Sequence, residues 1–258
     1  MAGHGETTRR PLVQSVERAL DILEMAGRSR LPLRNGEIAR GLGVSAATAN
    51  NLIRTLFRRG YLEQDADGRY TLGLRSFVLG TAADTWRDLR AKTLEPMRRF
   101  VRASGATCFL GIFHHFQVIA INVLEGTGPI SISMRQMWLD QCHSTAAGKI
   151  LLGGLSHTEL AAFLGHNPLR RLTERTICDP EKLMAEIAAV QERGYAVARD
   201  ESVFGISSTG VPVLDRDGRI LAALSCSFSS YFLDEKYLSR QLALLRKTKQ
   251  ELEEILRS

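Results

Sequence analysis

A run of twenty residues, GVSAATANNLIRTLFRRGYL at positions 43–62, constrains the fold of this chain more than any other segment. Ser45 precedes a periodic apolar run, so its hydroxyl is expected to cap a helix that extends to about Arg59. Gly60 is a residue type that commonly ends a helix. Small residues occupy the first turn of this helix, which predicts that its start approaches another surface closely.

The segments on either side of this helix predict a known arrangement. Residues 15–28 and 34–42 each carry an apolar stripe at helical spacing. After Gly60, Tyr61-Leu62 and 70–72 are strand-like, and 65–68 (DADG) supplies turn residues between them. Three helices and a hairpin predict a winged helix-turn-helix, whose third helix enters the major groove of DNA.

A helix that enters a groove must present small or hydrogen-bonding side chains, with arginines where phosphates pass. The predicted third helix meets this requirement, and the hairpin adds one arginine. The candidate DNA-binding residues are Ser45, Ala46, Ala47, Thr48, Asn50, Asn51, Arg54, Arg58 and Arg69. A merely solvated helix face is the alternative interpretation of these polar side chains.

The distribution of charge supports a polyanion as partner. Residues 1–80 contain twelve arginines and eight acidic residues, a net charge of +4, whereas the other 178 residues have a net charge of +2. A basic end on a nearly neutral body is typical of a DNA-binding module attached to a second domain.

Length and cysteine usage bound the class of protein. A chain of 258 residues can form two ordinary domains, each with a core. We expect a cytoplasmic protein with no membrane partner, because no apolar run has membrane-spanning length and the first residues, MAGHGETTRRP, are polar. The four cysteines are far apart, which argues against a disulfide framework and a sequence-local zinc site.

The rest of the chain predicts a helical connector and an α/β domain. Residues 74–104 have a helical pattern, and Pro96 is expected to open a separate helix within it. From 106 onward, strand-like runs alternate with helical blocks, and a last helix covers about 234–257. The predicted division is a winged helix-turn-helix domain at 1–80, a linker at 81–104 and a second domain at 105–258.

Several segments, in their order and spacing, resemble the IclR family of bacterial transcriptional regulators over nearly the full length. SVERALDIL, EIARGLGVS, NNLIRTLFRRGYL and YTLG resemble its DNA-binding domain, and CHSTAAGK, ERGYAVARDES, GISSTGVPVLDRDG and AALSCS resemble its effector-binding domain. The resemblance implies an α+β protein in which a helical linker joins the winged helix-turn-helix to a GAF-like or profilin-like α/β domain. It also implies a homodimer or a dimer of dimers on a roughly palindromic operator.

The family also implies a site for a small-molecule effector. It lies between the start of the helix after the HxTAxGK segment, here Ala146 and Ala147, and a strand with paired serines, here Ser225 and Ser227. Free amides at a helix start attract a carboxylate, and a spacing of two places both serines on one strand face. Ser208 is expected to supply a further hydroxyl, and Met134 or Trp138 a wall.

Some positions depart from the family pattern. Ala198 replaces a frequent acidic residue, Ser208 replaces a common cysteine, and Met137 and Gln141 stand where a glycine and a proline are expected. In the DNA helix, Ala46 and Asn51 replace a lysine and an arginine of many relatives. Neither the effector nor the operator sequence can therefore be transferred from the family.

The alternative function is a small-molecule enzyme with an accessory winged helix. It lacks support, because Thr209 interrupts a GxSxG motif and Gly148-Lys149 lacks the remainder of a phosphate loop. We expect no cofactor and no metal. His143 is interpreted as a buried histidine bonded to the backbone rather than a metal ligand beside Cys142, and Asp200-Glu201 as surface charge. A winged helix that binds a protein partner is a third possibility.

Overall fold

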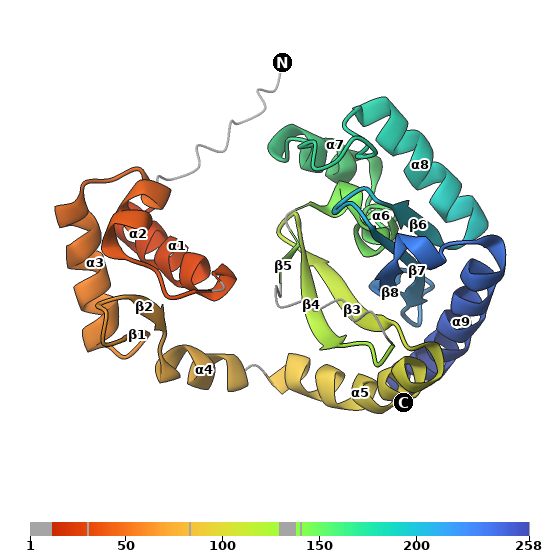
Figure 1. The fold of residues 1–258 in the computed structure, drawn as a ribbon, viewed down its shortest axis with the longest axis horizontal. Helices are drawn as coiled ribbons and strands as arrows, with labels where there is room; N and C mark the ends of the chain where they lie inside the picture. Colours follow the sequence, from red (N-terminus) through yellow and green to blue (C-terminus); the bar gives the residue numbers. More distant parts are fainter. Residues whose placement is uncertain (1–11, 30, 83, 129–137, 140, 258) are drawn as a thin grey trace, which may run out of the picture. The chain divides into compact units, whose positions relative to one another are not determined.

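The computed structural model describes residues 12–29, 31–82, 84–128, 138, 139 and 141–257. The chain divides into two compact units, Met1–Asp84 and Thr85–Ser258. Both contain helices and strands (Figure 1). In the described part of the chain, no helix is long and apolar enough to cross a membrane.

The first unit is the predicted winged helix-turn-helix. Its elements are α1 (Gln14–Arg28), α2 (Asn35–Leu42), α3 (Ala46–Arg58), β1 (Leu62–Gln64), β2 (Tyr70–Leu72) and α4 (Leu74–Thr81). The two strands pair antiparallel with Leu62 opposite Leu72. Ile22, Ile38, Ile53 and Leu62 are at most 1% exposed and form the centre of a small core that fixes the angle of α3.

The caps of α3 form as the sequence predicts. The Ser45 hydroxyl accepts a hydrogen bond from the Thr48 amide at 3.2 Å. At the other end, Gly60 adopts a positive φ of 74°, the left-handed conformation that glycine adopts without steric cost. The helix therefore begins and ends where residue type dictates.

The second unit is built around one antiparallel sheet. Its strands are β3 (Thr107–His114), β4 (Gln117–Leu124), β5 (Trp138–Leu139), β6 (Ala196–Arg199), β7 (Ile206–Leu214) and β8 (Ile220–Ser229), in the order β5-β4-β3-β8-β7-β6. The neighbours β3 and β8 pair in the middle of the sheet, although they are far apart in the sequence.

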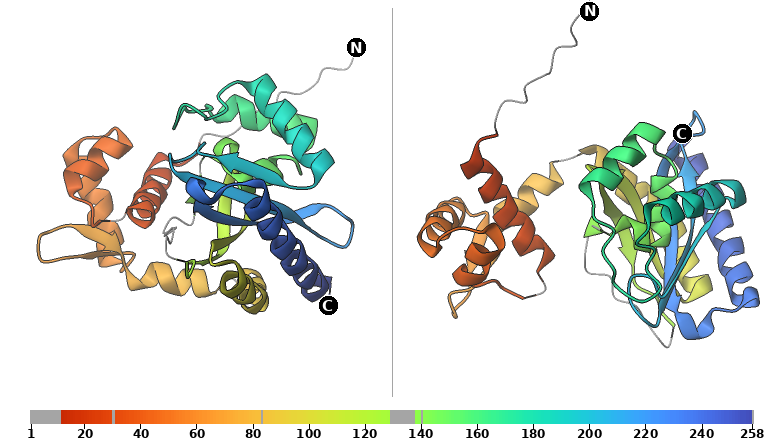
Figure 2. Two further views of the ribbon diagram at one scale, coloured as in Figure 1. Left: turned by 45° about the vertical axis from the view of Figure 1, so that its right-hand side comes forward. Right: turned by 90° about the horizontal axis from the view of Figure 1, so that it is seen from above.

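Helices cover both faces of this sheet. On one face lie α5 (Asp84–Ser104) and α9 (Glu235–Arg257), whose apolar side chains join Leu110 and Leu224 in one core cluster. On the other face lie α6 (Ala146–Leu152), α7 (His157–His166) and α8 (Pro180–Arg193), packed against Phe109 and Ala223. Figure 2 shows the sheet between these two helical layers.

The predicted fold class, α+β with a winged helix-turn-helix followed by an α/β domain, is confirmed. One helix differs from the prediction: α5 runs through Pro96 without a break, so no separate helix begins there. Met97, Phe100 and Val101, which follow the proline, are buried in the core of the second unit. Packing thus holds the helix together across a residue that removes one backbone hydrogen bond.

Candidate DNA interface and effector site

The exposed side of α3 carries most of the candidate DNA-binding residues. Ala49, Ile53 and Leu56 point into the core. The opposite side leaves these candidates exposed: Ser45, Ala46, Ala47, Asn50, Asn51, Arg54 and Arg58. Thr48 is half-buried, and its hydroxyl lies 2.9 Å from that of Ser45. The helix thus offers small residues in its first turn and polar ones beyond it.

The two asparagines differ in their surroundings. Asn50 Oδ1 accepts a hydrogen bond from Asn35 Nδ2 of α2 at 3.3 Å, so its amide is oriented by the neighbouring helix. Asn51 Oδ1 lies 3.5 Å from Arg54 Nη2, at the limit of a hydrogen bond. An oriented side-chain amide suits the edge of a base better than a mobile one.

Arg69 lies on the hairpin, directly before β2. Asp65 accepts a hydrogen bond from the Arg69 backbone amide at 2.8 Å, which fixes the turn. The Arg69 side chain is half-buried and reaches toward the start of α2 instead of extending from the hairpin tip.

In the second unit, the candidate effector residues of the described chain share one sheet face. The register places Ser208 of β7 opposite Ser227 of β8, and Gly210 opposite Ser225. These positions alternate with residues buried under α5 and α9, so the three serines face the α6 side. Ser225 is 4% exposed, and Ser208 and Ser227 are half-buried.

The start of α6 lies against this serine row. The Thr145 side chain caps the helix by accepting a hydrogen bond from the Gly148 amide at 3.1 Å. Ser208 Oγ accepts from the Ala146 amide at 3.3 Å. The predicted neighbours are thus brought together, and a hydroxyl already occupies the acceptor position where a carboxylate was expected. Ala146 and Ala147 are both buried.

The predicted walls of the site cannot be described in the same way. Met134 lies outside the described residues, and Trp138 is described only as part of β5, where it pairs with Ile119 of β4.

His143, directly before α6, is 2% exposed, and its Nε2 lies 3.1 Å from the carbonyl oxygen of Arg170. Because a carbonyl only accepts, Nε2 carries the proton. Burial lowers the pKa of His143, and the Arg170 carbonyl opposes this effect. This agrees with the predicted buried histidine. Among the residues that the structure describes, no three His, Cys, Asp or Glu side chains gather as a metal site.

A buried ion pair that the sequence interpretation missed anchors α6. Lys149 is 1% exposed, and its Nζ donates to Glu201 Oε1 at 2.6 Å and lies 3.7 Å from Glu186 Oε1. Burial raises the pKa of Glu201, while the charge of Lys149 opposes that rise. A lysine in the apolar run AAGKILL was the available signal, because such a charge needs a buried partner.

Asp200 and Glu201 are 7% and 8% exposed, so their interpretation as surface charge was wrong. Asp200 has a positive φ of 56°, and its carboxylate accepts hydrogen bonds from the Gly205 amide and the Ser230 hydroxyl. The hydroxyls of Thr173 and Thr176 donate to the backbone carbonyls of Asp200 and Glu201. This loop thus connects the segment before α8, the end of β8 and α6.

Comparison with known proteins identifies both units. Residues 82–254 match the family described as "Bacterial transcriptional regulator IclR C-terminal", and residues 15–66 match the "IclR helix-turn-helix domain". The chain is 32% identical over 235 residues to the HTH-type transcriptional regulator XynR of Escherichia coli, covering 89% of this chain and 91% of that protein.

Solved structures agree on the fold. An IclR-type regulator from Alicyclobacillus acidocaldarius superimposes with a TM-score of 0.80 at 26% identity, over 95% of this chain and 99% of that one. An IclR homolog from Microbacterium hydrocarbonoxydans, complexed with 4-hydroxybenzoate, gives a TM-score of 0.78 at 24% identity, over 94% and 98% of the two chains. With both units matched in order along the chain, this protein belongs to the IclR family of helix-turn-helix transcriptional regulators.

Proposed function

We propose that this regulator binds its operator as a homodimer through α3, and that a small carboxylate-bearing effector bound beside α6 changes the operator affinity. The observation that carries the DNA half is the exposed side of α3, which combines small residues, two asparagines and two arginines above a well-formed core. The chain acts by binding and not by catalysis, in the cytoplasm, where a bacterial chromosome lies.

Pairing of two chains is supported by an apolar groove on the first unit. A groove of about 520 Å³ is lined by residues of α1, α3 and α4, among them Leu20, Leu23 and Leu79. Val16 and Leu20 of α1 are each 54% exposed, and Phe77 of α4 is 68% exposed. Apolar side chains this exposed on two neighbouring helices are typical of a protein–protein interface.

The test of the DNA half separates recognition of bases from attraction to phosphates. Asn50→Ala and Asn51→Ala should each be assayed on DNA from upstream of the protein's own gene and on random DNA. We expect Asn50→Ala to reduce the free-energy difference between specific and random binding by about 1–3 kcal/mol, the value of a good asparagine–adenine pair. Arg58→Gln is the control, because loss of a phosphate contact should lower both affinities together. An unchanged ratio in both asparagine variants would contradict base readout by α3.

The effector half is supported by the row of hydroxyls at the start of α6. Ser208, Ser225 and Ser227 lie on the face that α6 covers, and the Ser208 hydroxyl already accepts from the Ala146 amide. A carboxylate of the effector would take over this acceptor role and leave the serine hydroxyls free to donate to it. Hydrogen bonds to a charged group contribute about 1.5–3 kcal/mol each.

A panel of small carboxylates, with 4-hydroxybenzoate among them, should be screened by thermal shift on the full chain. The double variant Ser225→Ala/Ser227→Ala should weaken binding of a hit at least about tenfold, while DNA binding without effector stays unchanged. Ser239→Ala is the matched control, because Ser239 is exposed on α9, which covers the other sheet face. Wild-type effector affinity in the double variant would place the ligand elsewhere.

A further inference from the structure

One isolated backbone bridge joins the loop between α1 and α2 to the hairpin. Leu33 and Tyr70 form an antiparallel bridge, in which the Leu33 amide donates to the Tyr70 carbonyl at 2.9 Å and the Tyr70 amide donates to the Leu33 carbonyl at 2.8 Å. In an antiparallel pair, the residue after Leu33 lies opposite the residue before Tyr70. This register sets Arg34 directly across from Arg69.

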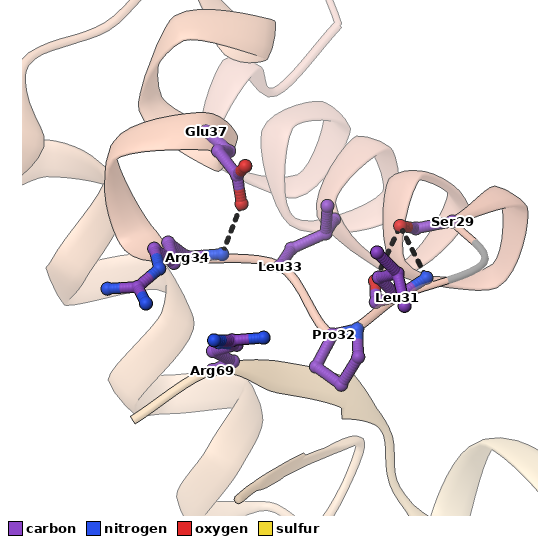
Figure 3. Close-up of a pocket in the computed structure, with 7 residues that line it drawn as sticks. All are labelled: Ser29, Leu31, Pro32, Leu33, Arg34, Glu37 and Arg69. Carbon is purple, nitrogen blue, oxygen red and sulfur yellow. Dashed lines mark hydrogen bonds between the residues drawn. The ribbon is translucent and has the colours of Figure 1, made fainter. Parts of the chain in front are cut away.

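Both side chains line one open pocket of about 410 Å³ (Figure 3). Like charges directly opposite each other on paired strands destabilise the pair. An anion between two arginines at this position, from the protein or from a ligand, would relieve their repulsion.

The protein supplies little of that negative charge. Glu37 lines the same pocket, but its Oε2 accepts the Arg34 backbone amide at 2.7 Å, and it forms no ion pair with the Arg34 guanidinium. Arg69 Nη2 lies 3.6 Å from the carboxylate of Asp67, whose side chain is 69% exposed, so this pair is weak. Arg69 Nε is buried and has no hydrogen-bond partner among the described residues.

The pocket is connected to the DNA-facing side of α3. Asn35 follows Arg34 as the first residue of α2, and its Nδ2 donates to Asn50 Oδ1 of α3. Arg34 in the pocket is thus the direct neighbour of Asn35, whose side chain contacts α3, the helix proposed to read bases. The first amides of α2 and the positive end of its dipole also favour an anion at this place.

We propose that Arg34 and Arg69 together bind one backbone phosphate of the duplex, beside the groove that α3 enters. This inference rests on the proposed DNA binding by α3. It adds Arg34 to the predicted Arg69, and the sequence did not single out Arg34 because it precedes a helix that is not the recognition helix. Guanidinium groups suit a phosphate, because each can offer two parallel N–H donors. The contact fixes the position of the protein on DNA and reads no base.

The experiment measures binding of the full chain to a short random-sequence duplex by fluorescence anisotropy at several salt concentrations. Each neutralised phosphate contributes about 0.9 to the slope of log affinity against log salt. The double variant Arg34→Gln/Arg69→Gln should therefore lower the slope by about 0.9 and weaken binding about eightfold at about 0.1 M salt. Arg28→Gln is the control, because Arg28 is paired with Glu24 on α1 and its variant should keep the wild-type slope.

Three results would overturn the inference. The first is an unchanged salt slope in the double variant. The second is a fall of the slope by about 1.8, which would mean that the two arginines neutralise separate phosphates. The third is a changed ratio of specific to random affinity, which would mean that they contact bases. If the wild type itself binds DNA without salt dependence, the proposed function fails and this contact with it. Wild-type binding with an unaffected variant removes only the contact.

Two further measurements identify the source of the phosphate and guard against misfolding. Inorganic phosphate titrated into the protein without DNA should bind equally weakly to wild type and double variant. Tight binding that only the variant loses would assign the pocket to a free anion. Arg34→Lys/Arg69→Lys keeps both positive charges and should have the salt slope of the wild type. A wild-type slope in the lysine variant would show that the glutamine variant loses slope because it loses charge.

Discussion

Gly148 shows how little space separates α6 from the turn before it. A Cβ at this position would lie 2.0 Å from the carbonyl oxygen of Cys142. We expect Gly148→Ala to destabilise the second unit by at least about 1–3 kcal/mol, the usual cost of overpacking, because backbone and not a flexible side chain must move. The midpoint of urea unfolding measures this change.

Gly165 provides the control for that substitution. It lies in α7, and a Cβ there would meet no heavy atom within 4 Å. Gly165→Ala should leave stability unchanged or raise it by at most about 1 kcal/mol, because alanine favours helix over glycine. Equal unfolding midpoints for the two variants would contradict the close contact at Gly148.

His143 gives the second unit a specific dependence on pH. Since burial lowers the pKa of His143 in the folded chain, protonation favours the unfolded chain. Its contribution is fully present above the ordinary histidine pKa of about 6.5 and is lost as pH falls through that value toward the lowered pKa. In His143→Gln, the loss of stability between neutral and mildly acidic pH should be smaller than in wild type.

The measurement is urea unfolding at a series of pH values. The quantity compared between variants is the slope of the free energy of unfolding against pH, not the free energy itself. His157→Gln is the control, because His157 is exposed at the start of α7. A pH slope in His143→Gln equal to that of wild type would mean that another group carries the effect.

Individual residues were predictable from sequence where a local rule decides their role. Ser45 caps α3, and His143 is buried against a backbone carbonyl. Asp200 and Glu201 were not predictable in this way, because their burial depends on a lysine and two threonines that lie 25 or more positions away. No local pattern in the sequence contains that information.

At the scale of elements, the Lys149–Glu201 pair holds α6 to the loop after β6. Glu201 Oε2 is buried and has no partner among the described residues, so this carboxylate depends on Lys149. Lys149→Met should destabilise the protein by about 3–5 kcal/mol, because it leaves a buried carboxylate unpaired. Chemical unfolding of the full chain measures the change.

The pair should be tested as a double-mutant cycle. Lys149→Met/Glu201→Leu removes both charges, so it should be less destabilised than the sum of the single variants. Arg28→Met/Glu24→Leu, at an exposed pair on α1, should show little coupling. Additive effects at Lys149 and Glu201 would mean that the pair does not act as a unit.

Elements with strong periodicity were predictable, and short ones were not. The sequence predicted α1, α3, α9 and the hairpin of β1 and β2 from apolar spacing, caps and turn residues. It did not predict β6, whose four residues are too few for a clear alternation. It also divided α5 at Pro96, because the packing of Phe100 and its neighbours against the sheet is a tertiary effect.

At the scale of the whole molecule, the apolar groove on the first unit predicts the oligomeric state. Leu20→Glu places a charge in that groove and should convert the proposed dimer to a monomer, as measured by analytical ultracentrifugation. The monomer should bind operator DNA more weakly, because it contacts only one half-site.

Phe204→Ser is the matched control, because Phe204 is 85% exposed but lies in the second unit. This variant should keep the wild-type sedimentation. If Phe204→Ser dissociates the protein and Leu20→Glu does not, the subunit contact belongs to the second unit.

The pairing of β3 with β8 has a consequence for synthesis on the ribosome. Roughly 110 residues separate the starts of these two strands, and at about 5–20 residues per second β8 emerges about 5–20 s after β3. During that interval the nascent chain carries an apolar strand with an unpaired edge, which is a substrate for chaperones. The first unit completes its core with residues before Gly73 and folds earlier. A chain cleaved in this interval would keep the unit with the helix-turn-helix and lose the unit proposed to bind the effector.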